Sequence, residues 1–239
     1  MSPALNAAEA AAWRRATWVV IAAYREAGVI GDVVGALRRG GWRVVVVDDG
    51  SDDGTAPIAA HAGAWVLRHA VNLGQGAALR TGFAFVLSQA DARIAVTFDA
   101  DGQHSPEAIE PLVAPIARGE TDVTLGSRFL DPASAREVPA TRRALLRLAT
   151  LLARVTTGLR LTDTHNGLRA FSTDALGRLN LQQDRMAHAS EIQAEIAGQR
   201  LRYQEVPVQV AYTEYSVAKG QRVVDSVSII WELLLAKLR

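Results

Sequence analysis

Short apolar runs alternate with helical patterns through the first half of this chain, and this alternation constrains the fold more than any other feature. The run 42–47 is almost continuously apolar, which is typical of a strand that is buried on both faces. The predicted strands cover 17–23, 42–47, 64–67, 93–98 and 122–126, and the predicted helices cover 27–39, 55–62, 75–90 and 106–118. This order predicts an α/β fold with a mostly parallel sheet and helices on both of its faces.

The pattern changes after residue 128. The second half predicts a mobile loop at 131–140, a helix at 141–157, a polar loop at 162–169, a helix at 187–198, strands near 201–206 and 208–213, and a final helix at 222–238. Right-handed crossovers between parallel strands place the loops that follow the strands along one edge of the sheet, where ligands bind.

Composition excludes several classes of protein. Of the 239 residues, 49% are hydrophobic and 21% are charged, which predicts a packed core. The net charge of +1 gives no general affinity for nucleic acid, and the absence of cysteine excludes disulfides and thiolate metal sites. Residues 1–16 do not resemble a signal peptide, and no segment reaches about 18 consecutive apolar residues, so we expect a cytoplasmic chain without a membrane-spanning helix.

Two aspartates, Asp99 and Asp101, directly follow the predicted strand 93–98. Carboxylates one residue apart at the end of a buried strand are hard oxygen ligands that suit Mg²⁺ or Mn²⁺ with positions left for substrate phosphates. The alternative is an ordinary turn, in which Asp and Gly are common. His104 is interpreted as a phosphate contact or a support for the ligands, and the other four histidines as structural.

A second acidic stretch, 48–53, follows the strand 42–47. Asp49 lies directly beyond the strand, where its carboxylate can accept the N–H of a nucleobase. The remaining acids also fit a turn and a helix cap. The Asn-x-Gly-x-Gly sequence at 72–76 opens a helix, but Leu79 replaces the third glycine of the dinucleotide fingerprint, so tight packing is the preferred interpretation.

An ordered set of motifs carries a family resemblance. It comprises Tyr24-Arg25-Glu26, Asp48-Asp49-Gly50-Ser51, Asn72-x-Gly-x-Gly, Asp99-Ala100-Asp101-Gly-Gln103-His104, Gly126-Ser127-Arg128-Phe129, the segment 163–169 and the segments 212–216 and 218–220. Together they resemble family 2 glycosyltransferases, and the similar branch contains dolichol-phosphate mannose synthase and the bacterial polyprenyl-phosphate sugar transferases. The resemblance covers roughly 17–235.

The resemblance implies a single GT-A-type domain over 17–235, with a Rossmann-like, mostly parallel sheet flanked by helices and a C-terminal helical extension. Its nucleotide-sugar half is expected at 17–130, its acceptor half at 131–220 and its C-terminal helix at 222–238. Two departures from the family pattern affect the base pocket. Arg25 stands where the family has asparagine, and Ala22-Ala23 lack the usual proline.

The resemblance also implies roles for individual residues. Those expected to bind the nucleotide sugar are Ala22, Tyr24, Glu26, Val47, Asp49, Asp99, Ala100, Asp101, Gln103 and Arg128. Asp99, Asp101 and Gln103 are expected to surround the metal. Asp101, Arg128 and Lys219, from the C-terminal basic loop, are the expected catalytic residues.

Arginines are common in the second half of the chain, and this favours a phosphate as acceptor. A sugar hydroxyl needs a general base, whereas a phosphate monoester, with a second pKa of about 6, is already a nucleophilic anion at neutral pH. The predicted acceptor-phosphate ligands are Arg143, Arg147 and Arg169. Glu191 and Asp163 are the candidates for a general base or a sugar contact. The alternative for Glu191 is an acid on the helix surface without a role in the site.

Helix 141–157 combines arginines with leucines. Arg143, Arg147 and Arg154 share one face, and apolar side chains form a broad surface beside them, which suits a helix lying in a membrane interface. The alternative is an amphipathic helix packed on the sheet.

The predicted function is metal-dependent, inverting transfer of a hexose from a UDP- or GDP-linked sugar to a polyprenyl phosphate. The enzyme is expected to be peripheral at the inner face of the membrane, without nucleic acid as a partner, and a homodimer is left open. The alternatives are a glycosyltransferase with a soluble or glycan hydroxyl acceptor, a nucleotidyltransferase and a non-catalytic nucleotide-sugar-binding protein.

Overall fold

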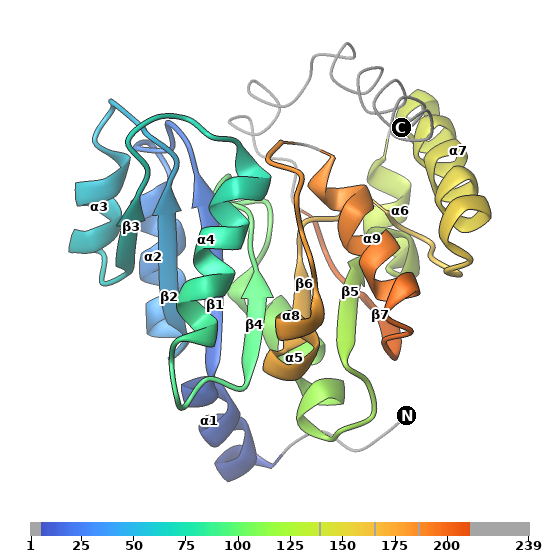
Figure 1. Cartoon of the computed structure of the whole chain (residues 1–239), viewed down its shortest axis with the longest axis horizontal. Coiled ribbons are helices and arrows are strands. Elements are labelled where there is room, and N and C mark those ends of the chain that lie inside the picture. Colours follow the sequence, from blue (N-terminus) through green and yellow to red (C-terminus); the bar gives the residue numbers. More distant parts are fainter. Residues whose placement is uncertain (1–5, 139, 165, 186, 211–239) are drawn as a thin grey trace.

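A seven-stranded sheet forms the centre of the computed structural model, which describes residues 6–138, 140–164, 166–185 and 187–210 (Figure 1). The strands are β1 (Thr17–Ala23), β2 (Arg43–Asp48), β3 (Trp65–Arg68), β4 (Ile94–Thr97), β5 (Val123–Ser127), β6 (Arg169–Ser172) and β7 (Tyr203–Pro207). Their order is β3-β2-β1-β4-β6-β5-β7, and only the pairs made by β6 are antiparallel. The predicted mostly parallel sheet is confirmed.

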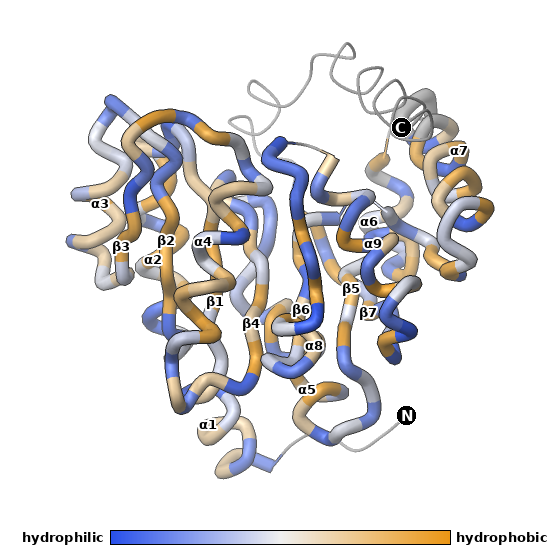
Figure 2. The backbone as a smooth tube through the Cα atoms, viewed as in Figure 1, coloured by the Kyte–Doolittle hydropathy of each residue, from blue (hydrophilic) through white to orange (hydrophobic). Residues whose placement is uncertain are grey.

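Helices cover both faces of this sheet (Figure 1). They are α1 (Ala7–Ala16), α2 (Ile30–Arg39), α3 (Thr55–His61), α4 (Gln75–Leu87), α5 (Ile109–Ala117), α6 (Pro132–Glu137), α7 (Ala140–Thr157), α8 (Thr173–Arg178) and α9 (His188–Gly198), with 3₁₀ turns η1 (Pro106–Ala108) and η2 (Arg128–Leu130). Val19 and Ile21 of β1 pack with α2 and α5, whereas Trp18 and Val20 pack with α4 and α9. Successive side chains of a strand point to opposite faces, so each strand supplies two cores. The apolar character that this requires is plain along β2 in Figure 2.

The strand β6 is not predicted: the expected polar loop over 162–169 is confirmed for the described residues up to 168, and the strand follows it. Arg169 opens the strand, and Ser172 already caps the following helix α8, which the sequence analysis also misses. A four-residue strand that begins with a charged residue has no apolar run long enough to be recognised. Its position matters, because β6 lies between β4 and β5 and pairs with both.

Two further helices, α6 and α1, lie where none is predicted. The expected loop 131–140 contains α6, whose start is capped by Asp131, since the Asp131 carboxylate accepts the N–H of Ser134 at 2.8 Å. Helix α1 begins with a capping box made by Asn6 and Glu9.

The strand near 201–206 is present as β7, but residues 208–210 form no strand. Residues 211–213 of that predicted strand, and the predicted helix 222–238, lie outside the described residues.

The carboxyl ends of β1, β2, β4 and β5 meet at one edge of the sheet, at the upper side of Figure 1. The loops 24–29, 49–54 and 98–105 and the turn η2 leave this edge. Because β6 runs in the opposite direction, the loop 162–168 enters β6 at the same edge. This edge therefore gathers most of the predicted site residues. Within the described part of the chain, no helix is both long and apolar enough to cross a membrane.

Candidate active site

The acidic pair lies directly beyond β4, at the edge where the loops meet. The backbone N–H of Gln103 donates to Oδ1 of Asp101 at 3.1 Å, which closes the turn that carries both aspartates. Buried His104 packs edge-to-face on Phe98, and its Nε2 lies 3.6 Å from Oδ2 of Asp99. The structure therefore brings Asp99, Asp101 and Gln103 together, with His104 beside Asp99.

The two carboxylates have different acidities. Burial raises the pKa of Asp101, and the neighbouring charge of Asp99 raises it further. Burial also acts to raise the pKa of Asp99, but adjacent His104 and the positive charge of Arg169 outweigh it, so that pKa is lowered. The neighbours of Asp101 do not fully offset its burial and the repulsion from Asp99, and a bound cation would stabilise its ionised form.

The donor set fits a hard divalent cation that is only partly enclosed by protein. No group of three or more His, Cys, Asp or Glu side chains able to hold a metal ion occurs in the described residues. Mg²⁺ is commonly bound by one or two carboxylates together with substrate phosphates, so Asp99 and Asp101 match this mode of binding. The ligand roles of these residues and of Gln103 stay predictions.

Two buried arginines lie at the same edge. Arg169 is opposite Thr97 of β4 and Leu125 of β5, and its Nε donates to the carbonyl of Asn166 at 3.1 Å. Burial lowers the pKa of Arg169, and the charges of Asp99 and Asp163 oppose this. An arginine guanidinium is not deprotonated in proteins, so this group carries a positive charge.

Arg128 forms a buried ion pair with Asp163. Its backbone N–H and its Nε donate to Oδ2 of Asp163 at 3.2 and 2.6 Å, and both side chains are almost fully buried. Asp163 and Arg169 belong to the segment that enters β6, so the unpredicted strand places the charge of Arg169 near both Asp99 and Asp163. The edge therefore offers carboxylates for a cation and guanidinium groups for phosphate.

His188 is a buried histidine of this region that the sequence analysis leaves as structural. Its Nδ1 lies 2.8 Å from the carbonyl oxygen of Arg185 at the start of α9. Burial, with the positive charge of Arg169, lowers the pKa of His188 from 6.5 to about 4. His188 is therefore neutral at pH 7, and no metal-ligand spacing in the sequence points to its place here.

We expect His188 to make folding sensitive to acid. Because its pKa is 6.5 in the unfolded chain and about 4 in the fold, the unfolded state binds the proton first as the pH falls. The folded state should lose at most about 3 kcal/mol between pH 6.5 and pH 4 through this group, and nothing above pH 6.5. Unfolding of the wild type and of His188→Gln across this range measures it. A stability difference that does not change with pH would contradict the expectation.

Asp48 and Asp49 of the second acidic stretch, 48–53, bind β3 and the loop that follows it. Oδ1 of Asp49 lies 2.7 Å from Nδ1 of His69 and accepts the N–H of Leu73 at 2.9 Å, and its Oδ2 accepts the N–H of Gly74 at 2.8 Å. Asp48 forms an ion pair with Arg68 at 3.2 Å. Asp49 is only 3% exposed, and its carboxylate uses three of its roughly four acceptor positions on this loop. Its predicted contact with a nucleobase stays a prediction.

In the segment after β1, Arg25, which stands where the family has asparagine, forms an ion pair of its own. The Arg25 guanidinium donates from Nε and Nη2 to the two oxygens of Asp52, each at 2.9 Å, and lies over the ring of Tyr24. Glu26 is buried, and its backbone N–H donates to Thr55 Oγ1 at 2.8 Å. Beneath this segment, Ala22 and Val47 are partners in the β1–β2 register. The predicted base-pocket residues are thus neighbours.

The predicted acceptor residues on α7 and α9 have local contacts of their own. Nη2 of Arg143 donates to the carbonyl of Val138 at 3.0 Å, while Arg147 is exposed. The Glu191 carboxylate accepts the backbone N–H groups of Gln182 and Gln183 at 2.7 and 2.9 Å. The catalytic role of Glu191 and the phosphate roles of the arginines stay predictions. Lys219 lies outside the described residues.

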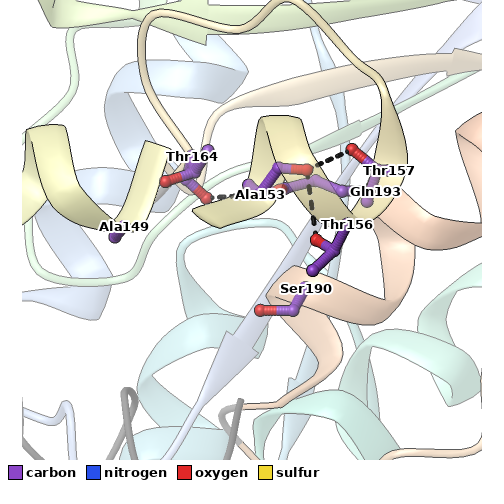
Figure 3. A pocket seen from close by; sticks show the side chains of 7 residues that line it. All are labelled: Ala149, Ala153, Thr156, Thr157, Thr164, Ser190 and Gln193. Carbon is purple, nitrogen blue, oxygen red and sulfur yellow. Dashed lines mark hydrogen bonds between the residues drawn. The ribbon is translucent and has the colours of Figure 1, made fainter. Parts of the chain in front are cut away.

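A pocket between α7 and α9 adjoins the arginine side of the site (Figure 3). It is lined by Ala149, Ala153, Thr156, Thr157, Thr164, Ser190 and Gln193. Nε2 of Gln193 donates to the carbonyl of Thr164 at 2.8 Å, and Thr164 directly follows Asp163. The lining carries hydroxyl and amide groups but no charge, so it is chemically distinct from the charged edge of the sheet.

Comparisons with known proteins give the family and several relatives of this chain. Residues 18–179 match the family described as Glycosyl transferase family 2. The chain is 32% identical to UDP-N-acetylglucosamine–dolichyl-phosphate N-acetylglucosaminyltransferase of Methanococcus voltae, over 92% of the chain and 96% of that protein. It is 30% identical to undecaprenyl-phosphate mannosyltransferase of Micrococcus luteus, over 82% and 86%.

The fold also resembles a solved structure. This is glucosyl-3-phosphoglycerate synthase from Mycobacterium tuberculosis, crystallised with Mn²⁺, UDP-glucose and phosphoglyceric acid. The TM-score is 0.69 at 22% identity, and the match covers 99% of this chain and 85% of the other.

Proposed function

The chain belongs to glycosyl transferase family 2, and on that premise we propose that it transfers a hexose from a nucleoside-diphosphate sugar to a polyprenyl phosphate. It is a glycosyltransferase with a GT-A-type fold, as the motif resemblance implies. The proposal concerns the donor, the acceptor and the requirement for Mg²⁺ or Mn²⁺. The division into a nucleotide-sugar half at 17–130 and an acceptor half at 131–220 is part of the same proposal.

The observation that carries the proposal is the meeting of both signs of charge at one edge of the sheet. Asp99 and Asp101 follow β4, while Arg128 follows β5 and Arg169 opens β6 between them. A bound divalent cation would supply positive charge against the diphosphate that leaves the sugar. Similarity to the Methanococcus voltae transferase over nearly the whole of both chains supports a polyprenyl phosphate as acceptor.

The residues of this chain would then act mainly by positioning and electrostatics. Arg128 and Arg169 would hold phosphate oxygens through charge-assisted hydrogen bonds, which are stronger than neutral ones. The acceptor phosphate monoester is already an anion at pH 7, so its attack on the anomeric carbon needs no general base. Attack from the face opposite the leaving diphosphate inverts the configuration.

Transfer assays test this proposal directly. Labelled UDP-N-acetylglucosamine, UDP-glucose and GDP-mannose are each incubated with detergent-dispersed polyprenyl phosphate and Mn²⁺. We expect label from one donor to enter the organic phase and chelator to abolish the transfer. Transfer to soluble acceptors at the same rate without lipid would contradict the polyprenyl acceptor.

The second candidate function has a soluble acceptor. It is favoured by the match in fold to glucosyl-3-phosphoglycerate synthase, which was crystallised with phosphoglyceric acid. The same assay without lipid, with phosphoglyceric acid as acceptor, distinguishes the two functions.

Helix α7 supports the peripheral membrane location within this proposal. Its buried residues include Leu146 and Ala149, and the helix packs against α9. Leu148, Leu151 and Val155 are 48%, 55% and 72% exposed and lie at helical spacing on one side. Exposed arginines, Arg147 and Arg154, lie on the same helix. An apolar ridge beside arginines matches an anionic membrane surface.

We expect Leu151→Glu to weaken binding to anionic vesicles about tenfold or more. A buried leucine side chain contributes about 1.5–3 kcal/mol, and the added carboxylate is repelled by anionic lipid. Vesicle co-sedimentation measures the change. Leu87→Glu is the matched control, because Leu87 is 45% exposed at the end of α4, on the opposite edge of the sheet. Equal partitioning of both variants would mean that α7 does not contact lipid.

A further inference from the structure

Gly167 lies in the loop that enters β6, directly against the carboxylate of Asp99. A Cβ atom at position 167 would be 2.6 Å from Cγ of Asp99 and closer still to both carboxylate oxygens. Real Cβ atoms essentially never come within 3.0 Å of such a neighbour. The Asp99 carboxylate therefore occupies the space that any side chain at position 167 would need.

A partly buried hydrogen bond keeps Gly167 at this position. Thr97 is the last residue of β4, and its Oγ1 donates to the carbonyl oxygen of Gly167 at 2.6 Å. Thr97 also pairs with the loop's strand directly, because it is the register partner of Arg169 at the start of β6. The loop is thus tied to the same strand that leads into Asp99. Moving Gly167 away from the carboxylate would break this partly buried hydrogen bond and leave the hydroxyl of buried Thr97 without it, which is costly.

The other described neighbours of Asp99 also restrict it. His104 is buried, and its Nε2 is 3.6 Å from Oδ2 of Asp99. The aspartate at 101 follows one residue later and is constrained by the N–H of Gln103. A carboxylate displaced by a new Cβ atom must therefore rotate within a crowded turn, and its orientation relative to Asp101 would change.

We propose that Gly167 is a positioning residue for the metal-binding aspartates. Its missing side chain lets Asp99 take the orientation in which it and Asp101 face one cation together. This inference rests on the proposed metal-dependent function. The backbone of Gly167 lies outside the left-handed region, so alanine is conformationally acceptable there, and the carboxylate is the group that must move.

The test compares Gly167→Ala with Gly177→Ala. Gly177 is in α8, and a Cβ atom there would meet nothing within 4 Å. Binding of Mn²⁺ in the presence of UDP is measured by electron paramagnetic resonance of the free ion. Residues that orient metal ligands typically change metal affinity 10- to 100-fold, so we expect a loss of about that size for Gly167→Ala and none for Gly177→Ala. Thermal unfolding shows whether each variant is folded.

Two further variants make the result decisive. Asp101→Asn should lose Mn²⁺ binding if the metal assignment is right. Thr97→Val removes the hydrogen bond that holds Gly167 and should weaken Mn²⁺ binding about threefold to fivefold, which decides the matter if Gly167→Ala does not fold.

The outcomes separate the inference from the proposed function. Wild-type Mn²⁺ affinity in folded Gly167→Ala, with loss in Asp101→Asn, overturns the positioning role and leaves the metal assignment intact. If Gly167→Ala does not fold, wild-type affinity in Thr97→Val overturns it in the same way. Wild-type affinity in Asp101→Asn overturns the metal assignment, and the positioning role with it.

Discussion

Asp101→Asn is expected to lower the rate of sugar transfer about 100- to 1,000-fold without destabilising the protein. The amide keeps the size of the side chain but removes the charge that would hold the cation against the diphosphate. Burial and the charge of Asp99 already raise the pKa of Asp101, so its ionised form is unfavourable in the free protein. Replacing it relieves that repulsion, and the stability should stay the same or rise.

Initial rates at saturating Mn²⁺ and the midpoint of thermal unfolding together check this result. Asp174→Asn is the matched control, since Asp174 is exposed in the first turn of α8. It lies at the opposite edge of the sheet, because Ser172 is the register partner of Ile94 at the start of β4. Full turnover in Asp101→Asn would refute the catalytic role, and a large loss of stability would show a structural one.

Asp163→Ala is expected to lower the free energy of unfolding by about 3–5 kcal/mol. The variant leaves the guanidinium of Arg128 buried without the carboxylate that lies 2.6 Å from its Nε. It also removes a negative charge that favours the protonated form of Arg169. A buried charge that loses its partner keeps its full desolvation cost, which is why the expected loss is large.

An exposed ion pair of the same kind is the control. Asp122 pairs with Arg202 at 2.7 Å, but the Arg202 side chain is 59% exposed. Asp122→Ala should cost about 1 kcal/mol or less, because solvent screens surface pairs. Urea unfolding of both variants measures the two losses, and equal losses would contradict the buried role of Asp163.

Ligand binding should partly restore Asp163→Ala. If Arg128 faces phosphate in the complex, UDP or pyrophosphate supplies the missing negative charge, and the thermal midpoint should rise more in the variant than in the wild type. An equal rise in both proteins would mean that Arg128 does not contact the phosphates.

The strand and helix order of the first half is predictable from the sequence because its signals are local. Strand β2 is a continuous apolar run, buried along nearly its whole length, and β4 is directly followed by its two aspartates. The same locality explains why Asp99, Asp101 and Gln103 are recognised together, since one turn contains all three. Where local signals are weak, as in β6, prediction fails, although the strand lies in the middle of the sheet.

The chain's local patterns thus suffice for its fold class and its family, because each strand, helix and motif consists of residues that are close in sequence. The same patterns give the acidic half of the site as a prediction. The partners of the acidic pair depend on strand order and register. Thr97 and Gly167 are 70 positions apart, and they meet because β6 pairs antiparallel with β4. No periodicity in the sequence encodes that pairing, so Arg169, Gly167 and His188 are assigned to the surroundings of Asp99 by the folded arrangement alone.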